Sequence, residues 1–279
     1  MYGELIDELC KWIAKDENFF DPASYPLKNK VAKAEILLKE DNVVVSGIEI
    51  IELLSKKFCL ETLFKVRDGQ LTSSGVVGNI KGCAYDLLVC ERTFLNILSI
   101  MSATATRTYQ LVQKIRKLGY NTKIAATRKV LPFVGELQKL AVIHGGGDSH
   151  RWNLFETIMI KDNHKKLYGS ISKAVEEIRK LVSFTKKIEV EVEAEEELEE
   201  AIESEVDIIM LDNFPPEKVK ELARRIKSRN PKILVEASGG INEETVEEYL
   251  CPDLDVISIG RLTSEIRYVD FSLEVVDSL

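Results

Sequence analysis

The chain has 279 residues, of which 45% are hydrophobic and 30% are charged, and its formal net charge is −8 at pH 7. This length suits one large barrel or a barrel with a smaller companion domain, and the acidic balance argues against a nucleic-acid partner. We also expect no membrane partner, because no run approaches the roughly 18 apolar residues of a membrane span.

The first part of the chain has the pattern of an α+β domain. Apolar residues at spacings of three and four predict an amphipathic helix from residue 2 to about residue 15, and a second helix is predicted from 47 to about 58. The predicted strands are 34–38, 43–45, 62–66 and 76–83. Successive short strands with one or two helices indicate an α+β sandwich.

The second part of the chain alternates strands with helices. One or two long helices, from residue 86 to about 118, lead into it. The predicted strands are 123–126, 157–160, 187–192, 206–211, 232–236 and 255–259, and the helices between most of them are 170–181, 195–203, 217–228 and 242–250. Repeated βα units predict a parallel sheet, and this many of them predict a closed or nearly closed barrel.

Polar or glycine residues follow directly after each of these predicted strands. They are Thr127-Arg128-Lys129, Lys161-Asp162-Asn163, Glu191 with Glu193, Asp212-Asn213, Ser238-Gly239-Gly240 and Gly260-Arg261. Barrels of this kind carry their ligand sites on the loops after the carboxyl ends of the strands. We therefore predict one ligand site at these strand ends.

Positive charge is concentrated between residues 125 and 164. This stretch contains Arg128, Lys129, Arg151 and Lys161, a glycine turn at 145–147 and all three histidines of the chain. Arginine offers a planar bidentate fork and lysine a compact point charge. Together they suit a small ligand with several carboxylates or phosphates. Among the histidines, His150 beside Arg151 is the best candidate for a ligand contact.

Glu191 and Asp212 follow neighbouring strands and should face one another at the barrel mouth. Mg²⁺ takes one or two protein carboxylates and completes its octahedron with water and substrate phosphate. Glu189, Glu191 and Glu193 alternate along one strand and so point to one side, where an acidic inner face calls for a cation or a ligand. We expect Glu191 and Asp212 to hold Mg²⁺.

Two glycine-containing strings on the last two strands favour a phosphate site. Ser238-Gly239-Gly240 ends one strand, and Ser258-Ile259-Gly260-Arg261 ends the next. Backbone amides and helix amino termini in such loops bind anions, and barrels often hold phosphate between their last two strand loops.

The cysteines and the amino-terminal residues indicate the cellular compartment in which we expect the protein. Five cysteines show no CxxC spacing and no pairing with the histidines, which argues against a zinc site and for a reducing compartment. The first twenty residues lack the basic end and cleavage site of a signal peptide. We therefore expect a cytoplasmic protein.

Several strings, taken together, make the chain resemble the quinolinate phosphoribosyltransferases, the decarboxylating nicotinate-nucleotide pyrophosphorylase family. They are ERTFLN (91–96), TRK (127–129), GGG followed by HR (145–147 and 150–151), IKDNH (160–164), EVEVE (189–193), LDN (211–213), EASGG (236–240) and SIG (258–260). Each string alone is unspecific, but their order and spacing are specific. The resemblance is clear over about residues 91–263 and weaker before them.

The resemblance implies a fold and a reaction. The fold would be an α+β sandwich, residues 1–103 with 265–279 packing back on it, joined to an incomplete α/β barrel of about seven strands, residues 104–264. The reaction would transfer the phosphoribosyl group of phosphoribosyl pyrophosphate to quinolinate with loss of CO2, giving nicotinate mononucleotide and pyrophosphate. Family members work as dimers, which implies that Arg92 reaches into the partner subunit's site.

The resemblance also implies roles for single residues. Arg128, Lys129, His150 and Arg151 would bind the two carboxylates of quinolinate, with Thr127 in the same substrate-binding string.

The other substrate would meet a second set of residues. Lys129 and Lys161 would contact the pyrophosphate, while Glu191 and Asp212 would hold the ribose hydroxyls and Mg²⁺, and these four would be the catalytic residues. The 5-phosphate would be bound by Ser238, Gly239, Gly240 and Gly260, with Arg261 as a further donor.

The chain departs from the family's usual strings at a few positions. Ala126 precedes Thr-Arg-Lys where Asp is usual, Val130-Leu131-Pro132-Phe133 follows where Thr-x-Pro-Gly is usual, Ser149 stands in place of Asn, and Ser264 replaces a common His. A related enzyme that uses nicotinate or another acceptor, including a molybdate-operon relative, therefore stays open. So do a non-catalytic sensor of a phosphorylated metabolite and a Schiff-base aldolase built on Lys161.

Overall fold

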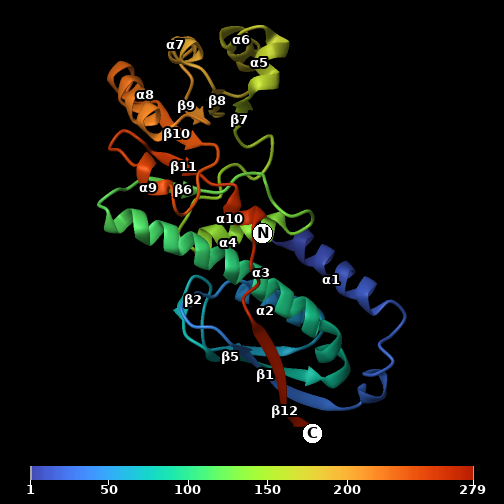
Figure 1. Ribbon diagram of the computed structural model, residues 1–279. Helices are drawn as coiled ribbons and strands as arrows, with labels where there is room; N and C mark the ends of the chain where they lie inside the picture. The colour runs from blue at the N-terminus through green and yellow to red at the C-terminus, as the bar shows by residue number, and fades with distance from the viewer. Residues whose placement is uncertain (1, 279) are drawn as a thin grey trace. The chain divides into compact units, whose positions relative to one another are not determined.

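The computed structural model describes residues 2–278 and divides into two compact units (Figure 1). Unit 1 contains Met1–Tyr109, Ile143–Gly146 and Ile266–Leu279, and unit 2 contains Gln110–Val142 and Gly147–Glu265. The domain boundary expected between residues 103 and 104 stays a prediction, because compactness alone does not show that either part folds by itself.

Unit 1 is built on a four-stranded antiparallel sheet with the strand order β12-β1-β5-β3. The strands are β1 (Val31–Leu38), β3 (Glu61–Phe64), β5 (Gly75–Cys83) and β12 (Phe271–Ser278). Every second residue of β1 from Ala32 to Leu38 is buried, as expected for a sheet with one face on a core. The carboxyl-terminal segment supplies β12, an edge strand paired with β1.

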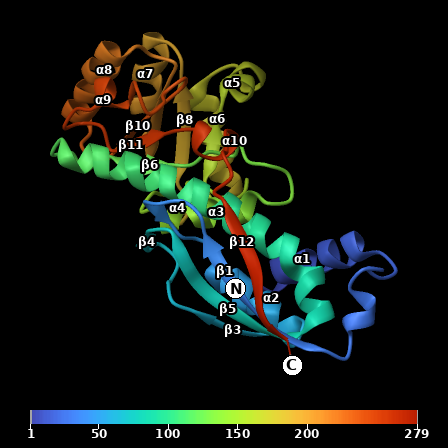
Figure 2. The same cartoon turned by 60° about the horizontal axis from the view of Figure 1, so that its bottom comes forward.

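Helices cover one face of this sheet, as Figures 1 and 2 show. They are α1 (Gly3–Glu17), α2 (Ile48–Lys57) and the first part of α3 (Ala84–Lys117). α2 begins after Gly47, whose φ of 111° favours glycine, and a Cβ there would lie 3.2 Å from side-chain atoms of Ile97 and Met101 on α3. A 3-10 helix (Tyr25–Leu27) and a small sheet of β2 (Val43–Val44) and β4 (Leu71–Thr72) complete the unit. The expected α+β layer is confirmed.

α3 is one continuous helix of 34 residues. By length and composition it could cross a membrane, contrary to the expectation that no stretch of the chain approaches a span. However, 67% of its most apolar window is buried inside the protein, and Phe94, Leu98 and Met101 are at most 1% exposed. Such burial is that of a core helix.

Unit 2 is built on six parallel strands with the order β6-β11-β10-β9-β8-β7. They are β6 (Lys123–Ala125), β7 (Ile158–Ile160), β8 (Ile188–Val192), β9 (Ile208–Asp212), β10 (Leu234–Ser238) and β11 (Val256–Ser258). Asp148 adds a single parallel bridge to Ala125 at the β6 edge. Since no described pairing joins β6 to β7, the barrel is incomplete, as the resemblance implies, and the described residues form six of its strands where about seven were expected.

Helices connect the strands of unit 2 and bury the outer face of the sheet. They are α4 (Gly135–His144), α5 (Asp162–Tyr168), α6 (Ile171–Leu181), α7 (Glu195–Glu203), α8 (Pro216–Arg229), α9 (Val246–Tyr249) and α10 (Arg261–Ser264). Val190 and Val192 of β8 join Leu198 of α7 and Leu222 of α8 in one buried cluster. Because side chains alternate along a strand, the glutamates of β8 face the barrel interior.

Two helices show where the sequence pattern is incomplete. The sequence does not predict α4, because the polar Gln138 and Lys139 occupy its buried face and interrupt the apolar spacing. α9 is shorter than the predicted 242–250 because Asn242 Oδ1 accepts hydrogen bonds from the amides of Glu244 and Thr245. That turn competes with helix formation.

Candidate active site

A cavity of about 460 Å³ lies in unit 2 at the carboxyl ends of the parallel strands. Nine of the residues predicted from the sequence line it: Thr127, Arg128, Lys129, His150, Arg151, Lys161, Glu191, Asp212 and Ser238. They come from β8, β9 and β10, from the position directly after β7, from the loop after β6 and from the segment beside Asp148. The incomplete barrel therefore brings cations and carboxylates from distant parts of the chain to one place.

The predicted glycines lie in turns next to this cavity. A Cβ on Gly239, which has a φ of 96°, would lie 2.3 Å from Asn213 Oδ1. A Cβ on Gly260 would lie 3.0 Å from Lys129 Cδ. Gly240 has a φ of 65°, in the left-handed region that favours glycine. The glycines thus permit close approach between neighbouring strand-end loops.

Two predicted arginines are not among the residues that line the cavity. Arg92 is exposed on α3, within unit 1. Arg261 is exposed at the start of α10, and its Nε lies 3.2 Å from Glu265 Oε1 in an ion pair. Their contributions to the site stay predictions.

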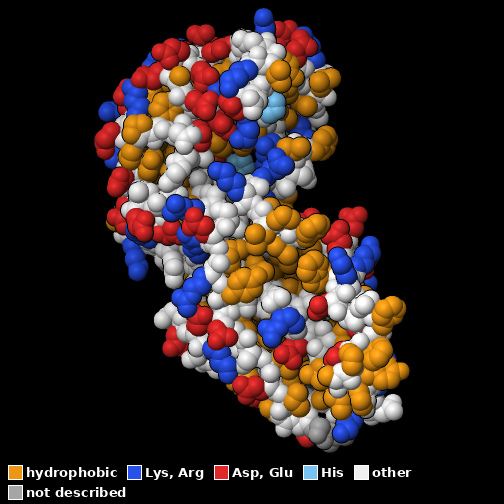
Figure 3. Space-filling view, turned by 45° about the vertical axis from the view of Figure 1, so that its right-hand side comes forward, with side chains coloured by type: hydrophobic (Ala, Val, Ile, Leu, Met, Phe, Trp, Pro, Cys, Tyr) orange, Lys and Arg blue, Asp and Glu red, His pale blue; other side chains and the backbone are white. Residues whose placement is uncertain are grey.

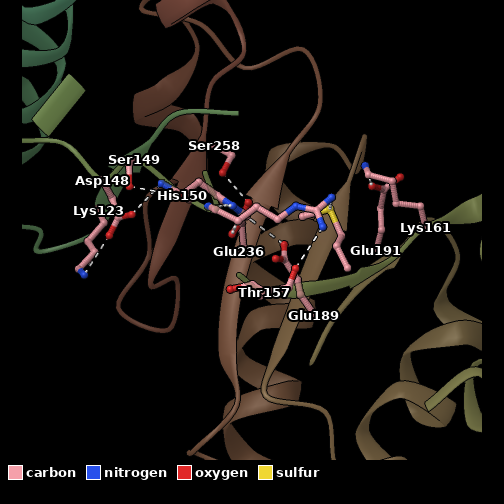
Figure 4. A network of polar contacts seen from close by, with 12 residues as sticks. Lys123, Asp148, Ser149, His150, Thr157, Lys161, Glu189, Glu191, Glu236 and Ser258 are labelled. Carbon is pink, nitrogen blue, oxygen red and sulfur yellow. Dashed lines mark hydrogen bonds and ion pairs between the residues drawn. The ribbon is translucent and has the colours of Figure 1, made fainter. Parts of the chain in front are cut away.

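Lys161 and three acidic residues form the electrostatic centre of the site. Lys161 Nζ donates to Glu191 Oε2 in a close ion pair, which Figure 4 shows. Oxygens of Glu191, Glu193 and Asp212 all lie within 4.8 Å of one another. Burial, and next the negative charge of Glu191, raise the pKa of Asp212. An all-oxygen set that is only partly buried leaves room for water and fits a hard cation such as Mg²⁺.

The loop after β6 presents Arg128 and Lys129 as exposed side chains. The Lys129 amide donates to Thr127 Oγ1 at 3.0 Å, and Thr263 Oγ1 donates to the Lys129 carbonyl at 2.7 Å. These bonds fix the backbone, and the guanidinium of Arg128 and the ammonium of Lys129 remain exposed to a ligand. In the space-filling view, Lys and Arg side chains gather beside a histidine on one face of unit 2 (Figure 3).

Arg151 forms a second cationic wall and is only 7% exposed. Its Nη1 donates to the Thr157 carbonyl at 3.1 Å, and its Nη2 lies 3.4 Å from Met159 Sδ. Burial lowers the pKa of Arg151. A guanidinium that has lost most of its water interacts strongly with an anion that enters the cavity.

His150 lies against the carboxylates of the barrel interior (Figure 4). Its backbone φ is 52°, and its amide donates to Asp148 Oδ1 at 2.9 Å. Its Nε2 lies 3.3 Å from Glu236 Oε2 and 3.6 Å from Glu189 Oε1. Burial alone lowers the pKa of His150, but the hydrogen bonds to Glu189 and Glu236 outweigh burial and raise the pKa, which keeps the proton on Nε2. Burial also raises the pKa of Glu189, so this cluster retains a proton at neutral pH.

The same three side chains do not suit a metal ion, although their ligand atoms lie within 4.8 Å of one another. The Arg151 amide donates to His150 Nδ1 at 2.7 Å, so that nitrogen carries no proton in this geometry. The ring proton is then on Nε2, which faces Glu189 and Glu236. A protonated ring nitrogen cannot bind a metal.

Sequence reasoning assigned no site role to the layer of residues directly below the predicted ones, although Ser258 belongs to the string expected to bind phosphate. Met159, Met210 and Ser258 also line the cavity, and Glu236 accepts a close hydrogen bond from Ser258 Oγ. Met159, Met210 and Glu236 each lie two positions before a predicted residue of the same strand or its end. The period of two along a strand is the signal that could have found them.

A larger cavity, of about 750 Å³, lies at the opposite end of the barrel. Most of its lining residues lie at the amino ends of the strands, among them Lys123, Lys187 and Asp255, and His150 and Arg151 line both cavities. Size alone would favour it, but in parallel barrels the chemistry lies at the carboxyl ends of the strands. We therefore place the candidate active site in the smaller cavity.

An incomplete parallel α/β barrel with cations, paired carboxylates and glycine turns at its strand ends defines a class, that of enzymes acting on polyanionic small molecules. The family model "Quinolinate phosphoribosyl transferase, C-terminal domain" matches residues 104–274, and the corresponding N-terminal domain model matches residues 21–102. The chain belongs to the quinolinate phosphoribosyl transferase family.

Similar proteins cover nearly the whole chain. A probable nicotinate-nucleotide pyrophosphorylase [carboxylating] from Methanocaldococcus jannaschii is 39% identical over 273 residues, covering 96% of each chain. The crystal structure of NadC from Streptococcus pyogenes is 33% identical, with a TM-score of 0.89 and 99% coverage of each chain. A nicotinate-nucleotide pyrophosphorylase from Francisella tularensis is 31% identical, with a TM-score of 0.89, covering 98% of this chain and 96% of the other.

Proposed function

We propose that the protein transfers the phosphoribosyl group of phosphoribosyl pyrophosphate to quinolinate with loss of CO2, forming nicotinate mononucleotide and pyrophosphate in NAD biosynthesis. The observation that carries this proposal is one cavity lined by Arg128, Lys129, Arg151 and Lys161 together with Glu191 and Asp212. A pyridine dicarboxylate requires paired cations. A sugar phosphate with a pyrophosphate requires cations and carboxylates at the same place.

Quinolinate occupies the wall formed by the β6 loop and the segment before β7. Arg128 and Lys129 reach in from the loop, and Arg151 faces them with its largely buried guanidinium. His150 lines the same wall, and its Nδ1 accepts the Arg151 amide while its Nε2 faces Glu236. In this geometry His150 orients the backbone of Arg151 through Nδ1 and directs its Nε2 proton toward Glu236.

Phosphoribosyl pyrophosphate occupies the opposite side of the cavity. Lys129 and Lys161 meet the pyrophosphate, and Glu191 and Asp212 meet the ribose hydroxyls. The 5-phosphate is held by the turns after β10 and β11, which contain Ser238, Gly239, Gly240 and Gly260, with Arg261 as a further donor. Amides in such turns are free to bind a phosphate oxygen because glycine leaves the backbone uncovered.

The reaction forms a bond from the pyridine nitrogen to C1 of the ribose and a C2–H bond, and it breaks the C1–O bond and the bond from C2 to its carboxylate. The pyridine nitrogen bonds to C1 of the ribose while the bond from C1 to the pyrophosphate oxygen breaks and its electron pair leaves with pyrophosphate. The cationic ring then stabilises the electron pair left at C2 when CO2 departs, and C2 takes a proton from water. The protein positions the two substrates, and the Lys161 ammonium stabilises the negative charge of the departing pyrophosphate.

One assay tests this proposal against its alternatives. The purified protein with quinolinate, phosphoribosyl pyrophosphate and Mg²⁺ should release CO2 and pyrophosphate in equal amounts. Pyrophosphate released from nicotinate, with no turnover of quinolinate, would select a related enzyme with another acceptor. Binding without turnover would select a sensor. Borohydride trapping of a substrate on Lys161 would select an aldolase.

Mg²⁺ belongs to this proposal, held by Glu191 and Asp212, where it would neutralise charge on the pyrophosphate. We predict that EDTA abolishes turnover and that added Mg²⁺ restores it. Asp212→Asn should raise the Mg²⁺ concentration for half-maximal activity by about tenfold or more, because a coordinating charge is lost. Glu196→Gln is the matched control, since Glu196 is an exposed glutamate on α7. Full activity in EDTA would contradict the assignment.

We also propose a cytoplasmic homodimer in which Arg92 of one subunit completes the site of the other. All five cysteines are free, as a reducing compartment requires. Arg92→Met and Lys161→Met subunits should each be inactive alone. Mixed, they should recover about a quarter of wild-type activity, because half of the dimers then contain one intact site. Light scattering measures the mass, and a mixture that stays inactive would argue against a shared site.

A further inference from the structure

α4 carries two adjacent polar side chains that are almost completely buried. Gln138 is 0% exposed and Lys139 is 3% exposed, while their neighbours Leu137, Ala141 and Val142 are apolar. Burial of an amide or an ammonium is unfavourable unless hydrogen bonds replace the lost water. Successive residues on a helix point about 100° apart. The two side chains can therefore serve different loops.

Gln138 joins the loop after β6 to the segment after β11. Its Oε1 accepts the Leu131 amide at 2.7 Å, and its Nε2 donates to the Thr263 carbonyl at 2.6 Å. Thr263 Oγ1 in turn donates to the Lys129 carbonyl at 2.7 Å. These bonds fix Lys129 against the turn that contains Gly260.

Lys139 holds a different part of the cavity wall. Its Nζ donates to the Ser149 carbonyl at 2.6 Å and to the Arg151 carbonyl at 2.8 Å. These carbonyls flank His150, whose φ of 52° is uncommon for a residue other than glycine. Burial lowers the pKa of Lys139 to about 8. A buried amine on two carbonyls thus holds a strained segment in the conformation that directs Arg151 to the cavity.

We propose that Lys139 is a positioning residue for dicarboxylate recognition, acting through the backbone of residues 149–151. This rests on the proposed function, in which Arg151 contacts quinolinate and the strand-end loops on the other side contact phosphoribosyl pyrophosphate. Lys139 itself does not line the active-site cavity. Gln138, one residue away on the same helix, anchors the β6 loop, which contacts both substrates, to the segment after β11.

The test compares two variants in which neighbouring buried polar residues are replaced by apolar ones. Lys139→Met keeps the length of the side chain and removes its donors, whereas Gln138→Leu removes the other anchor. We expect Lys139→Met to raise the KM for quinolinate at least about tenfold and to leave the KM for phosphoribosyl pyrophosphate within about twofold. A tenfold rise in KM corresponds to a loss of about 1.4 kcal/mol of binding free energy. Gln138→Leu, which loosens a loop that contacts both substrates, should raise both KM values.

Several outcomes would overturn this inference. Equal changes in both KM values for Lys139→Met would show a general structural role. If Lys139→Met does not fold, Lys139→Gln, which retains a donor, takes its place with the same expectation. If neither variant folds, Lys139 serves stability and not recognition. A wild-type protein that releases no CO2 from quinolinate refutes the proposed function instead, and so the two failures are distinguishable.

Discussion

Replacing Arg128 by Met should raise the KM for quinolinate by about 100-fold or more, while the KM for phosphoribosyl pyrophosphate changes by less than about threefold. Arg128 is exposed at the cavity wall, so its removal leaves no buried charge without a partner. What is lost is the bidentate contact with a substrate carboxylate. Hydrogen bonds between charged groups contribute about 1.5–3 kcal/mol each, and about 3 kcal/mol corresponds to a factor of about 100.

Steady-state kinetics with each substrate varied in turn would measure this effect, and calorimetric titration would give the affinity for quinolinate directly. Arg267→Met is the matched control, because Arg267 lies in unit 1 and its side chain is 88% exposed. It removes the same charge away from the cavity, and so it should leave both KM values unchanged. An unaltered affinity for quinolinate in Arg128→Met would contradict the assignment of this wall.

The repeating pattern of the barrel could be predicted from the sequence because it is local. In each βα unit a short apolar run identifies the strand, and the polar residue after it marks the strand's end. The run from Ile208 to Asp212 is an example. Parallel pairing then brings all carboxyl ends to one edge. This is why residues as distant as Thr127 and Ser238 could be placed at one site before the structure was known.

The partners of individual side chains could not be predicted in this way. The sequence places Lys161 and Glu191 at the same rim, but not in an ion pair, because their separation depends on the register between β7 and β8. The sequence likewise does not show that His150 turns toward Glu236. Which side chains pair depends on separations of a few ångströms across the barrel, and the sequence pattern does not specify these separations.

The buried polar residues of α4 were the hardest to predict. Apolar periodicity identifies helices that bury only hydrophobic groups. Gln138 and Lys139 are buried because carbonyls and amides from three loops satisfy them. Apolar periodicity alone would place these two side chains on the solvent-facing side of the helix. For α3 the apolar length was underestimated from the sequence, since composition alone suits a membrane span, although its burial is that of a core helix.

Replacing Lys161 by Met should lower kcat by about 10²- to 10³-fold, the usual cost of removing one preorganised group that stabilises charge in the transition state. Two effects add in this variant. The ammonium no longer meets the departing pyrophosphate, and Glu191, only 7% exposed, loses its ion-pair partner beside that growing negative charge. Lys166→Met is the matched control, because Lys166 is 74% exposed and pairs with Asp162 on α5.

A double-mutant cycle separates the two effects. If part of the loss in Lys161→Met is repulsion from Glu191, then Lys161→Met with Glu191→Gln should be less impaired than the product of the two single losses predicts. Single-turnover rates would show that the loss lies in the chemical step and not in product release. A kcat within about threefold of wild type would place Lys161 outside the chemistry. Strict multiplication of the single losses would mean that Lys161 and Glu191 act independently, despite their contact in the structure.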